Sequence, residues 1–248
     1  MMLPVLPRDP PSAVNDQRTA DQPETPEEPD APEVSSSAPD GAPVGDPRTT
    51  IAGRYEVNLE AQPADAGIAV AYLGRDLRTR APVTLKTLRL EYRDDPDMRA
   101  RFRREARLLQ FLSHPNVVRA LTFTEERGAP WLIMERVHGR TLRDEISANA
   151  PFPPEEVVPV IEGVAAALDH LHARGLIHLD LRPENVMVMP NRQVKLIDFG
   201  LAQTGGAVPE VASSGTHPYL APEQLTGDPV EVTTDVYALG TIVYEMLT

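Results

Sequence analysis

The chain has 248 residues, of which 41% are apolar, so it can bury a core in one large domain or two modest ones. Its formal net charge of -13 argues against a nucleic-acid partner, because binding to phosphate needs clustered Lys and Arg. The absence of cysteine excludes internal disulfides and thiolate metal sites, and it fits a reducing compartment. No segment approaches the ~20 apolar residues of a membrane-spanning helix, and residues 1–11 lack the apolar stretch of a secretory signal. We therefore expect a soluble, cytoplasmic protein.

Residues 1–50 differ in composition from the rest of the chain. They hold 11 of the 26 prolines and 10 acidic residues against 3 arginines, and they lack aromatic side chains. Such a segment cannot bury enough apolar surface to offset its ordering entropy, so we expect it to be disordered. A docking or regulatory tail and a solvated leader both remain open, and proline-rich composition alone favours the leader.

Residues 54–137 have the texture of a β-rich domain with one helix. Apolar runs and alternation predict five strands, at Tyr55–Glu60, Ile68–Leu73, Pro82–Leu88, Val117–Thr124 and Trp131–Val137. Between the third and fourth strands, Phe102, Ala106 and Leu109 recur at helical spacing and predict a helix over Asp97–Leu112.

Residues 138–248 are mainly helical in pattern. The clearest helix is Pro154–Arg174, with Gly175 as its stop. A β-rich part followed by a helical part, joined by a short connector at Glu135–Gly139, favours a ligand cleft between the two.

Three short motifs in the second half of the chain carry the chemistry. His178-Leu179-Asp180-Leu181-Arg182-Pro183-Glu184-Asn185 comes first, then Asp198-Phe199-Gly200, then Ala221-Pro222-Glu223. Together they supply a carboxylate that can orient a hydroxyl, and an amide and a second carboxylate whose oxygens suit Mg²⁺. This set is typical of phosphoryl transfer.

These motifs make residues 54–248 resemble a protein kinase domain, most similar to the bacterial Ser/Thr kinases of the eukaryotic-like type. The segments Gly215–Gln224 and Asp235–Gly240 add to the resemblance. It implies a bilobal α+β fold, with a small antiparallel β-sheet lobe carrying one helix and a mainly helical large lobe. It also implies that ATP and Mg²⁺ are bound and that the substrate is a protein carrying Ser or Thr.

The resemblance assigns catalytic roles in the large lobe. Asp180 would accept the proton of the substrate hydroxyl, and Asn185 and Asp198 would hold Mg²⁺. Arg182 replaces the family's Lys near the γ-phosphate, which keeps the charge but changes its shape. His178 would pack under Phe199. Asp180 by itself would more often cap a turn, and only its company favours catalysis.

The resemblance also assigns the nucleotide site. Lys86 would hold the α- and β-phosphates and pair with Glu105, which shares a helix face with Phe102 and Leu109. The side chains of Met134 and Met187 and the backbone from Glu135 to Val137 would surround adenine. Without the resemblance, Lys86 and Glu105 read as a surface pair and Met134 as plain core.

Two departures from the family pattern matter for function. Ala64, Ala66 and Ala69 occupy the three positions of the phosphate-covering glycines, and Asp65 between them would repel phosphate unless it turns outward. Leu179 stands where an Arg usually contacts a phosphorylated activation segment, which favours activity independent of that switch. Ser213, Ser214 and Thr216 remain either phosphorylation sites or polar filler.

The sequence stops at Thr248, one helix into the second half of the large lobe. We expect the later helices to be missing, together with the Arg that would pair with Glu223, which leaves Glu223 unpaired and the helix over Val236–Leu247 uncovered. Two functions follow. The chain is a Ser/Thr protein kinase or, alternatively, a pseudokinase-like scaffold that binds a protein partner, and the intact set of Lys86, Asp180 and Asp198 favours the enzyme.

Overall fold

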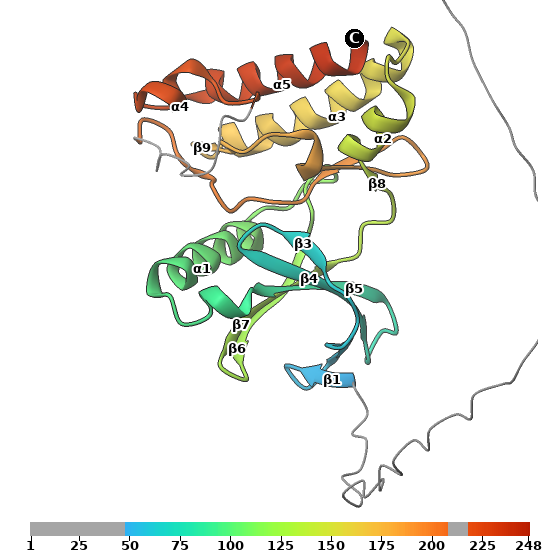
Figure 1. Cartoon of the computed structure of the whole chain (residues 1–248), viewed down its shortest axis with the longest axis vertical. Helices are drawn as coiled ribbons and strands as arrows, with labels where there is room; N and C mark the ends of the chain where they lie inside the picture. The colour runs from blue at the N-terminus through green and yellow to red at the C-terminus, as the bar shows by residue number, and fades with distance from the viewer. Residues whose placement is uncertain (1–47, 208–217) are drawn as a thin grey trace, which may run out of the picture. The chain divides into compact units, whose positions relative to one another are not determined.

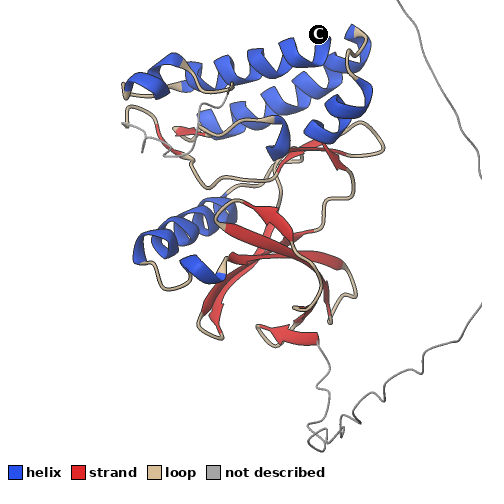
Figure 2. Cartoon of the chain, viewed as in Figure 1, coloured by secondary structure: helices blue, strands red, loops and turns tan. Residues whose placement is uncertain are grey.

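In the described part of the chain, β-strands dominate from residue 48 to residue 135 and helices dominate after residue 141 (Figures 1 and 2). The structure is a computed structural model that describes residues 48–207 and 218–248. All of these residues belong to one contact unit, Val44–Thr248. The β-rich part and the helical part within this unit match the small and large lobes expected from the sequence.

The small lobe is built on one antiparallel sheet. Its strand order in the described residues is β1-β2-β4-β5-β7-β6, and β3 pairs with β4. The strands are β1 (Arg48–Ile51), β2 (Tyr55–Asn58), β3 (Ala64–Ala66), β4 (Ala69–Asp76), β5 (Pro82–Leu88), β6 (Ala120–Glu126) and β7 (Ala129–Glu135). The five predicted strands correspond to β2, β4, β5, β6 and β7.

The two additional strands, β1 and β3, are too short to show as sequence patterns. The prediction that residues 1–50 are disordered is wrong at their end, because residues 48–50 pair with residues 56–58 of β2. Thr49 and Thr50 are β-branched, and Ile51 is buried in the small-lobe core, which together favour extended structure. Residues 1–47 lie outside the described part of the chain.

A single long helix, α1 (Pro96–Phe111), packs against the sheet. It begins at Asp95, whose carboxylate accepts hydrogen bonds from the backbone N–H groups of Asp97 and Met98, with Pro96 in the first turn. The predicted helix is confirmed to within one residue at each end. Its buried face contains Phe102, Glu105, Ala106 and Leu109.

The large lobe contains four α-helices in its described residues, with short strands between them. The helices are α2 (Leu142–Asn149), α3 (Pro154–His172), α4 (Pro222–Thr226) and α5 (Val232–Leu247). The strands are β8 (Arg140–Thr141), β9 (Leu176–Ile177), β10 (Val186–Val188), β11 (Val194–Leu196) and β12 (Gln203–Thr204). Two short 3₁₀ helices, η1 (Leu90–Tyr92) and η2 (Pro183–Asn185), complete the described elements. Helix α3 ends two residues earlier than predicted, and Gly175 adopts the left-handed conformation of a stop residue, with φ of 69°.

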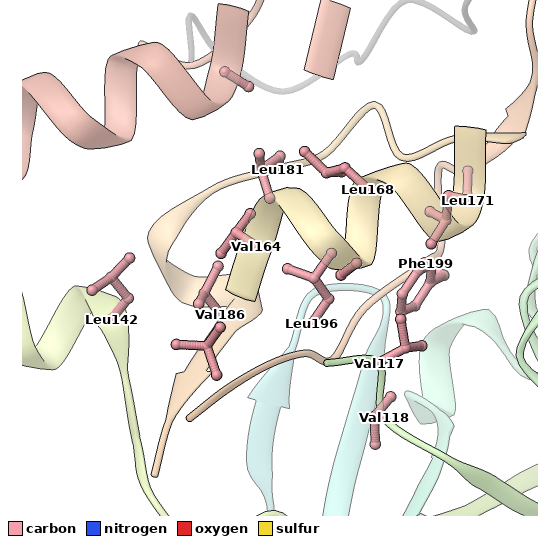
Figure 3. Close-up of a cluster of buried hydrophobic side chains, with 14 of the residues drawn as sticks. Val117, Val118, Leu142, Val164, Leu168, Leu171, Leu181, Val186, Leu196 and Phe199 are labelled. Atoms are coloured by element: carbon pink, nitrogen blue, oxygen red, sulfur yellow. The ribbon is translucent and has the colours of Figure 1, made fainter. Parts of the chain in front are cut away.

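A buried seam ties the two lobes together behind the predicted site. Val118 donates its backbone N–H to the carbonyl of Leu196 at 2.8 Å, and Leu196 donates to the carbonyl of Asn116 at 2.9 Å. Figure 3 shows the apolar cluster at this place, where Val117 and Val118 lie near Phe199 and Leu196. The segment that follows α1 is therefore hydrogen-bonded to β11 of the large lobe.

Helix α5 has one buried face and one exposed face. Ala238, Ile242 and Met246 are buried, whereas Val236 and Tyr244 are exposed, as expected for an uncovered helix. Glu223 has a hydrogen-bond partner in place of the Arg that the family would supply, because the Thr234 hydroxyl donates to Glu223 Oε1 at 2.6 Å. Among the helices in the described ranges, none has both the length and the apolar character needed to cross a membrane.

Candidate functional site

Lys86, Glu105 and Asp198 meet where the two lobes come together. The Lys86 ammonium on β5 donates to Glu105 Oε1 on α1 at 2.7 Å and lies 3.2 Å from Asp198 Oδ1 of the large lobe. The side chains of Lys86 and Glu105 are only 6% and 4% exposed. The predicted pairing of Lys86 with Glu105 is confirmed, and the surface-pair alternative is wrong.

The charges of Lys86 and Asp198 stabilise each other, whereas burial raises the pKa of the Glu105 carboxyl. Burial opposes the charge on Lys86, but the carboxylates of Asp198 and Glu105 raise the pKa of its ammonium above the ordinary value. Burial likewise opposes the charge on Asp198, yet Lys86 and the backbone N–H of Gly200 hold the pKa of that carboxyl below its usual range. At neutral pH the site therefore holds a buried cation beside an ionised Asp198.

Asp180 and Asn185 form a second pair on the segment between β9 and β10. The side-chain amide of Asn185 donates to the backbone carbonyl of Asp180 at 2.8 Å and to Asp180 Oδ2 at 3.0 Å. The short helix η2 begins at Pro183 and brings Asn185 back toward Asp180. Burial is the main cause that raises the pKa of Asp180 above its ordinary value, and Asp198 adds to the rise. A carboxylate with a raised pKa is a better proton acceptor.

The donor set fits a hard divalent cation. Asp198 Oδ1 accepts from Gly200 N at 3.0 Å and faces Lys86, so Oδ2 is its oxygen for a metal. Asn185 uses its NH₂ group toward Asp180 and keeps its amide oxygen for the same purpose. No group of three or more His, Cys, Asp or Glu able to hold a metal occurs within residues 48–207 and 218–248. This pattern suits Mg²⁺, which takes one or two protein oxygens together with water and phosphate.

His178 packs against Phe199, as predicted. Its ring is fully buried and lies 5.0 Å from the Phe199 ring, centroid to centroid. Figure 3 shows Phe199 within the apolar cluster of the large lobe. Leu109 belongs to the same cluster of buried side chains. The side chains next to Asp180 and Asp198 thus pack on each other and couple the two motifs.

The backbone before Asp180 is held by Asp235 and Gln224, to which the sequence pattern assigned no role at this site. Asp235 at the start of α5 accepts the N–H groups of His178 and Leu179, each at 2.9 Å. Gln224 of α4 donates to the carbonyl of Leu179 at 2.9 Å. These three bonds hold Leu179 at φ of 65°, a conformation that side-chain-bearing residues rarely adopt. An Asp at a helix start was visible in the sequence, but its buried partners are 56 and 57 residues away.

Leu179 is buried in a small apolar cluster. It packs with Ile177 and Val230, and Leu201, the residue directly after the Asp198–Gly200 turn, lies against the same cluster. An arginine at this position would place its charge among these apolar side chains. The predicted sites Ser213, Ser214 and Thr216 lie outside the described residues.

Arg182 forms an ion pair with Glu184, a residue of the same motif for which no role was predicted. Its Nε donates to Glu184 Oε2 at 2.8 Å, and Glu184 Oε1 also accepts from Arg143 of α2 at 2.9 Å. Burial works against the charge of Glu184, but the two arginines lower its pKa to about 2. The Arg143 guanidinium further contacts Glu245 of α5. Arg182 is therefore part of an ion-pair network that connects it through Glu184 to Arg143, and its contact with a phosphate stays a prediction.

The predicted adenine-side residues lie near the connector between the lobes. Met134 is buried on β7 opposite Thr84 of β5, and Val137 packs against the main core. The Glu135 side chain accepts from Lys195 at 2.7 Å, so it ties the connector to β11. Met187 is half-buried on β10. Their contact with adenine stays a prediction.

The glycine-poor loop forms a hairpin of ordinary geometry. Ala64 pairs with Ala71 and Ala66 with Ala69 across β3 and β4, and Gly67 takes the turn position with φ of 66°. Asp65 turns outward, as it must if it is not to repel a phosphate, because its side chain is 75% exposed and pairs with Arg89 at 2.6 Å. The arginine offsets its charge and lowers its pKa.

Comparison with known proteins places these observations in a family. Residues 66–248 match the model of the protein kinase domain. The chain is 37% identical over 190 residues to "Serine/threonine-protein kinase PknB" of Mycobacterium leprae, which covers 73% of this chain and 30% of that protein. It is 39% identical over 191 residues to the protein of the same name from Mycolicibacterium smegmatis, covering 73% and 31%. It is 38% identical over 207 residues to a "Probable serine/threonine-protein kinase" of Corynebacterium efficiens, covering 80% and 31%. The chain thus spans about three tenths of the length of these relatives.

Proposed function

The chain belongs to the protein kinase family, and on that premise we propose that it transfers the γ-phosphate of ATP to a serine or threonine hydroxyl of a protein. The observation that carries the proposal is the Lys86–Glu105–Asp198 cluster, which joins both lobes beside the Asp180–Asn185 pair. The names of the bacterial relatives support the choice of serine and threonine.

Asp180 is the proposed proton acceptor. Its carboxylate is fixed through Asn185, and the strained backbone before it is fixed through Asp235. A substrate hydroxyl within hydrogen-bond reach of Asp180 would be oriented for attack and would lose its proton to that carboxylate. Preorganisation of this kind removes motion that would otherwise oppose the reaction.

Lys86 is the proposed ligand of the α- and β-phosphates. In the structure its ammonium is shared by two carboxylates, and Glu105 holds it at the side of the site formed by α1. Asn185 and Asp198 would hold Mg²⁺, which supplies positive charge that offsets the phosphate charge during transfer. The raised pKa of Lys86 keeps the residue charged over the whole physiological range.

We further propose that activity does not require a phosphorylated activation segment. Leu179 joins the catalytic segment to Leu201 and Val230 by apolar packing, at the place where the family usually has an arginine. A phosphate would find no cation at residue 179, so ordering of this region relies on burial of apolar surface.

The alternative, a scaffold without catalysis, is favoured by one observation. The hairpin over the predicted phosphates carries Ala64 and Ala66, and a carboxylate between them, in place of glycines. A scaffold of this kind would bind a protein partner by conformation and would bind ATP weakly or not at all.

Phosphate transfer from labelled Mg-ATP to a generic basic protein tests the proposal. Wild type should transfer phosphate, and Asp180→Asn should reduce the rate by roughly 100-fold or more. Asp94→Asn, which changes an exposed Asp before α1, is the matched control and should behave as wild type. Equal transfer by wild type and Asp180→Asn would refute the enzyme. No transfer together with no Mg²⁺-dependent thermal stabilisation by ATP would refute the enzyme and favour the scaffold.

A further inference from the structure

Helix α1 contacts the Asp198–Phe199–Gly200 turn at a second point besides Glu105. The Arg101 side chain donates from Nε to the backbone carbonyl of Gly200 at 2.9 Å, across 99 residues of sequence. Arg101 lies four residues before Glu105, so both side chains leave the same face of the helix. The neighbouring arginines Arg99 and Arg103 instead pair with Glu125 inside the small lobe.

The two peptide groups that flank Gly200 are both engaged. Its N–H donates to Asp198 Oδ1 at 3.0 Å, and its carbonyl accepts from Arg101. The same Oδ1 lies 3.2 Å from the Lys86 ammonium. Arg101 is therefore two hydrogen bonds away from the carboxylate that the metal would use.

Three charged side chains gather around Gly200. A Cβ placed on Gly200 would lie 3.4 Å from Asp198 Oδ1, 3.8 Å from Glu105 Oε2 and 3.9 Å from Arg101 Nη2. The carboxylates of Glu105 and Asp198 and the guanidinium of Arg101 thus surround one glycine. A shift of the turn would disturb all three contacts together.

We propose that Arg101 is a positioning residue, which holds Asp198 in its metal-binding orientation from the small lobe. The inference rests on the proposed kinase function, because it assigns Arg101 to the metal site of that reaction. Arg101 would link the position of α1 to the Mg²⁺ dependence of the reaction through a contact separate from the Lys86–Glu105 pair. The hydrogen bond from Arg101 to Gly200 forms without a phosphorylated activation segment, which agrees with the apolar packing of Leu179 in the same region.

The test compares Arg101→Met with Arg101→Lys and Arg107→Met. Methionine keeps the apolar stem but removes the donor, whereas the lysine ammonium can still reach a carbonyl. Arg107 is exposed on α1, and six residues from Arg101 put it on another face of the helix. Arg107→Met is therefore the control for removing a charge from this helix.

The first measurement is amide hydrogen exchange of residues 198–201 without metal or nucleotide. Loss of a hydrogen bond from a charged donor should speed exchange of this turn about tenfold in Arg101→Met. Arg107→Met should stay within about twofold of wild type, and Arg101→Lys should recover most of the protection.

The second measurement is the Mg²⁺ dependence of binding and of turnover. In Arg101→Met, calorimetry with a non-hydrolysable ATP analogue should show the Mg²⁺ concentration for half-maximal binding raised by about fivefold to tenfold. Nucleotide affinity at saturating Mg²⁺ should change by less than about twofold. kcat should fall about tenfold with KM for ATP nearly constant.

The outcomes separate the inference from the function on which it rests. Equal exchange and equal Mg²⁺ dependence in Arg101→Met and Arg107→Met would overturn the role of Arg101. A lower melting temperature in Arg101→Met with unchanged Mg²⁺ dependence would do the same, since it would mark a purely structural contact. If wild type transfers no phosphate, the proposed function fails, and the exchange and calorimetry results still decide the inference.

Discussion

Replacing Leu179 by alanine and by glycine gives a sharp test of the strained segment before Asp180. Leu179 is 5% exposed and packs in a cluster whose other buried members are Ile177 and Val230. Removing three carbons from such a site costs about 2.5–3.5 kcal/mol of unfolding free energy, from lost transfer energy plus a residual cavity. We expect Leu179→Ala to be destabilised by that amount.

The glycine variant should break the usual order of stabilities. At an ordinary φ, glycine is about 0.5–1 kcal/mol less stable than alanine because its unfolded chain has more freedom. At φ of 65°, alanine carries a steric cost of about 1–2 kcal/mol that glycine avoids. Leu179→Gly should therefore be as stable as Leu179→Ala or more stable, by up to about 1 kcal/mol.

Urea unfolding at 25 °C, followed by far-UV circular dichroism, measures these differences. Leu225→Ala, at an exposed position of α4, should stay within about 0.5 kcal/mol of wild type. A glycine variant clearly less stable than the alanine variant would refute the left-handed backbone at residue 179. An alanine variant as stable as wild type would refute the apolar cluster.

Three further predictions concern charged and titratable groups. Lys86→Met should reduce phosphate transfer at least ~100-fold and lower the unfolding free energy by about 2–4 kcal/mol, because Glu105 and Asp198 would be left buried without their cation. Enzyme kinetics and urea unfolding measure the two effects, and an unchanged unfolding free energy would contradict the buried cluster. The pKa of Glu184 is about 2 in the folded state, so the stability that its charge contributes is present above its ordinary pKa of ~4.5 and is lost as pH falls toward 2. Glu184→Gln should remove about 1 kcal/mol of this pH dependence, after a discount for solvent exposure. Parallel curves of unfolding free energy against pH for wild type and Glu184→Gln, measured from pH 3 to 6, would argue against this effect. Burial lowers the pKa of His170, whose ring centroid lies 4.9 Å from that of His114. The unfolded state therefore takes up a proton at higher pH than the folded state, and the unfolding free energy falls as pH drops through ~6.5. His170→Gln should flatten the curve of unfolding free energy against pH between pH 7.5 and 5.5, and a slope equal to that of wild type would count against the effect.

Local pattern was sufficient to predict much of the fold. The alternation in Pro82–Leu88 and the helical spacing of Phe102, Ala106 and Leu109 correspond to β5 and α1 nearly residue for residue. Strands β1 and β3 were not predicted, because four and three residues carry too little periodicity. Their pairing depends on the neighbouring strands β2 and β4.

The sequence by itself determined which residues are the candidates for the chemistry, because residue type and spacing within a motif are local properties. Asp180 and Asn185 lie five residues apart, and the short turn between them is enough to bring their side chains together. The tertiary structure alone decided how distant groups modify them. Arg182 is bound by Glu184 in a network reaching Arg143, Asp235 holds the backbone before Asp180, and Arg101 reaches the carbonyl of Gly200. Most of these partners are separated from their targets by about 40 to 100 residues, and hydrogen bonding at such separation depends on how distant helices and strands pack together, which no local pattern encodes.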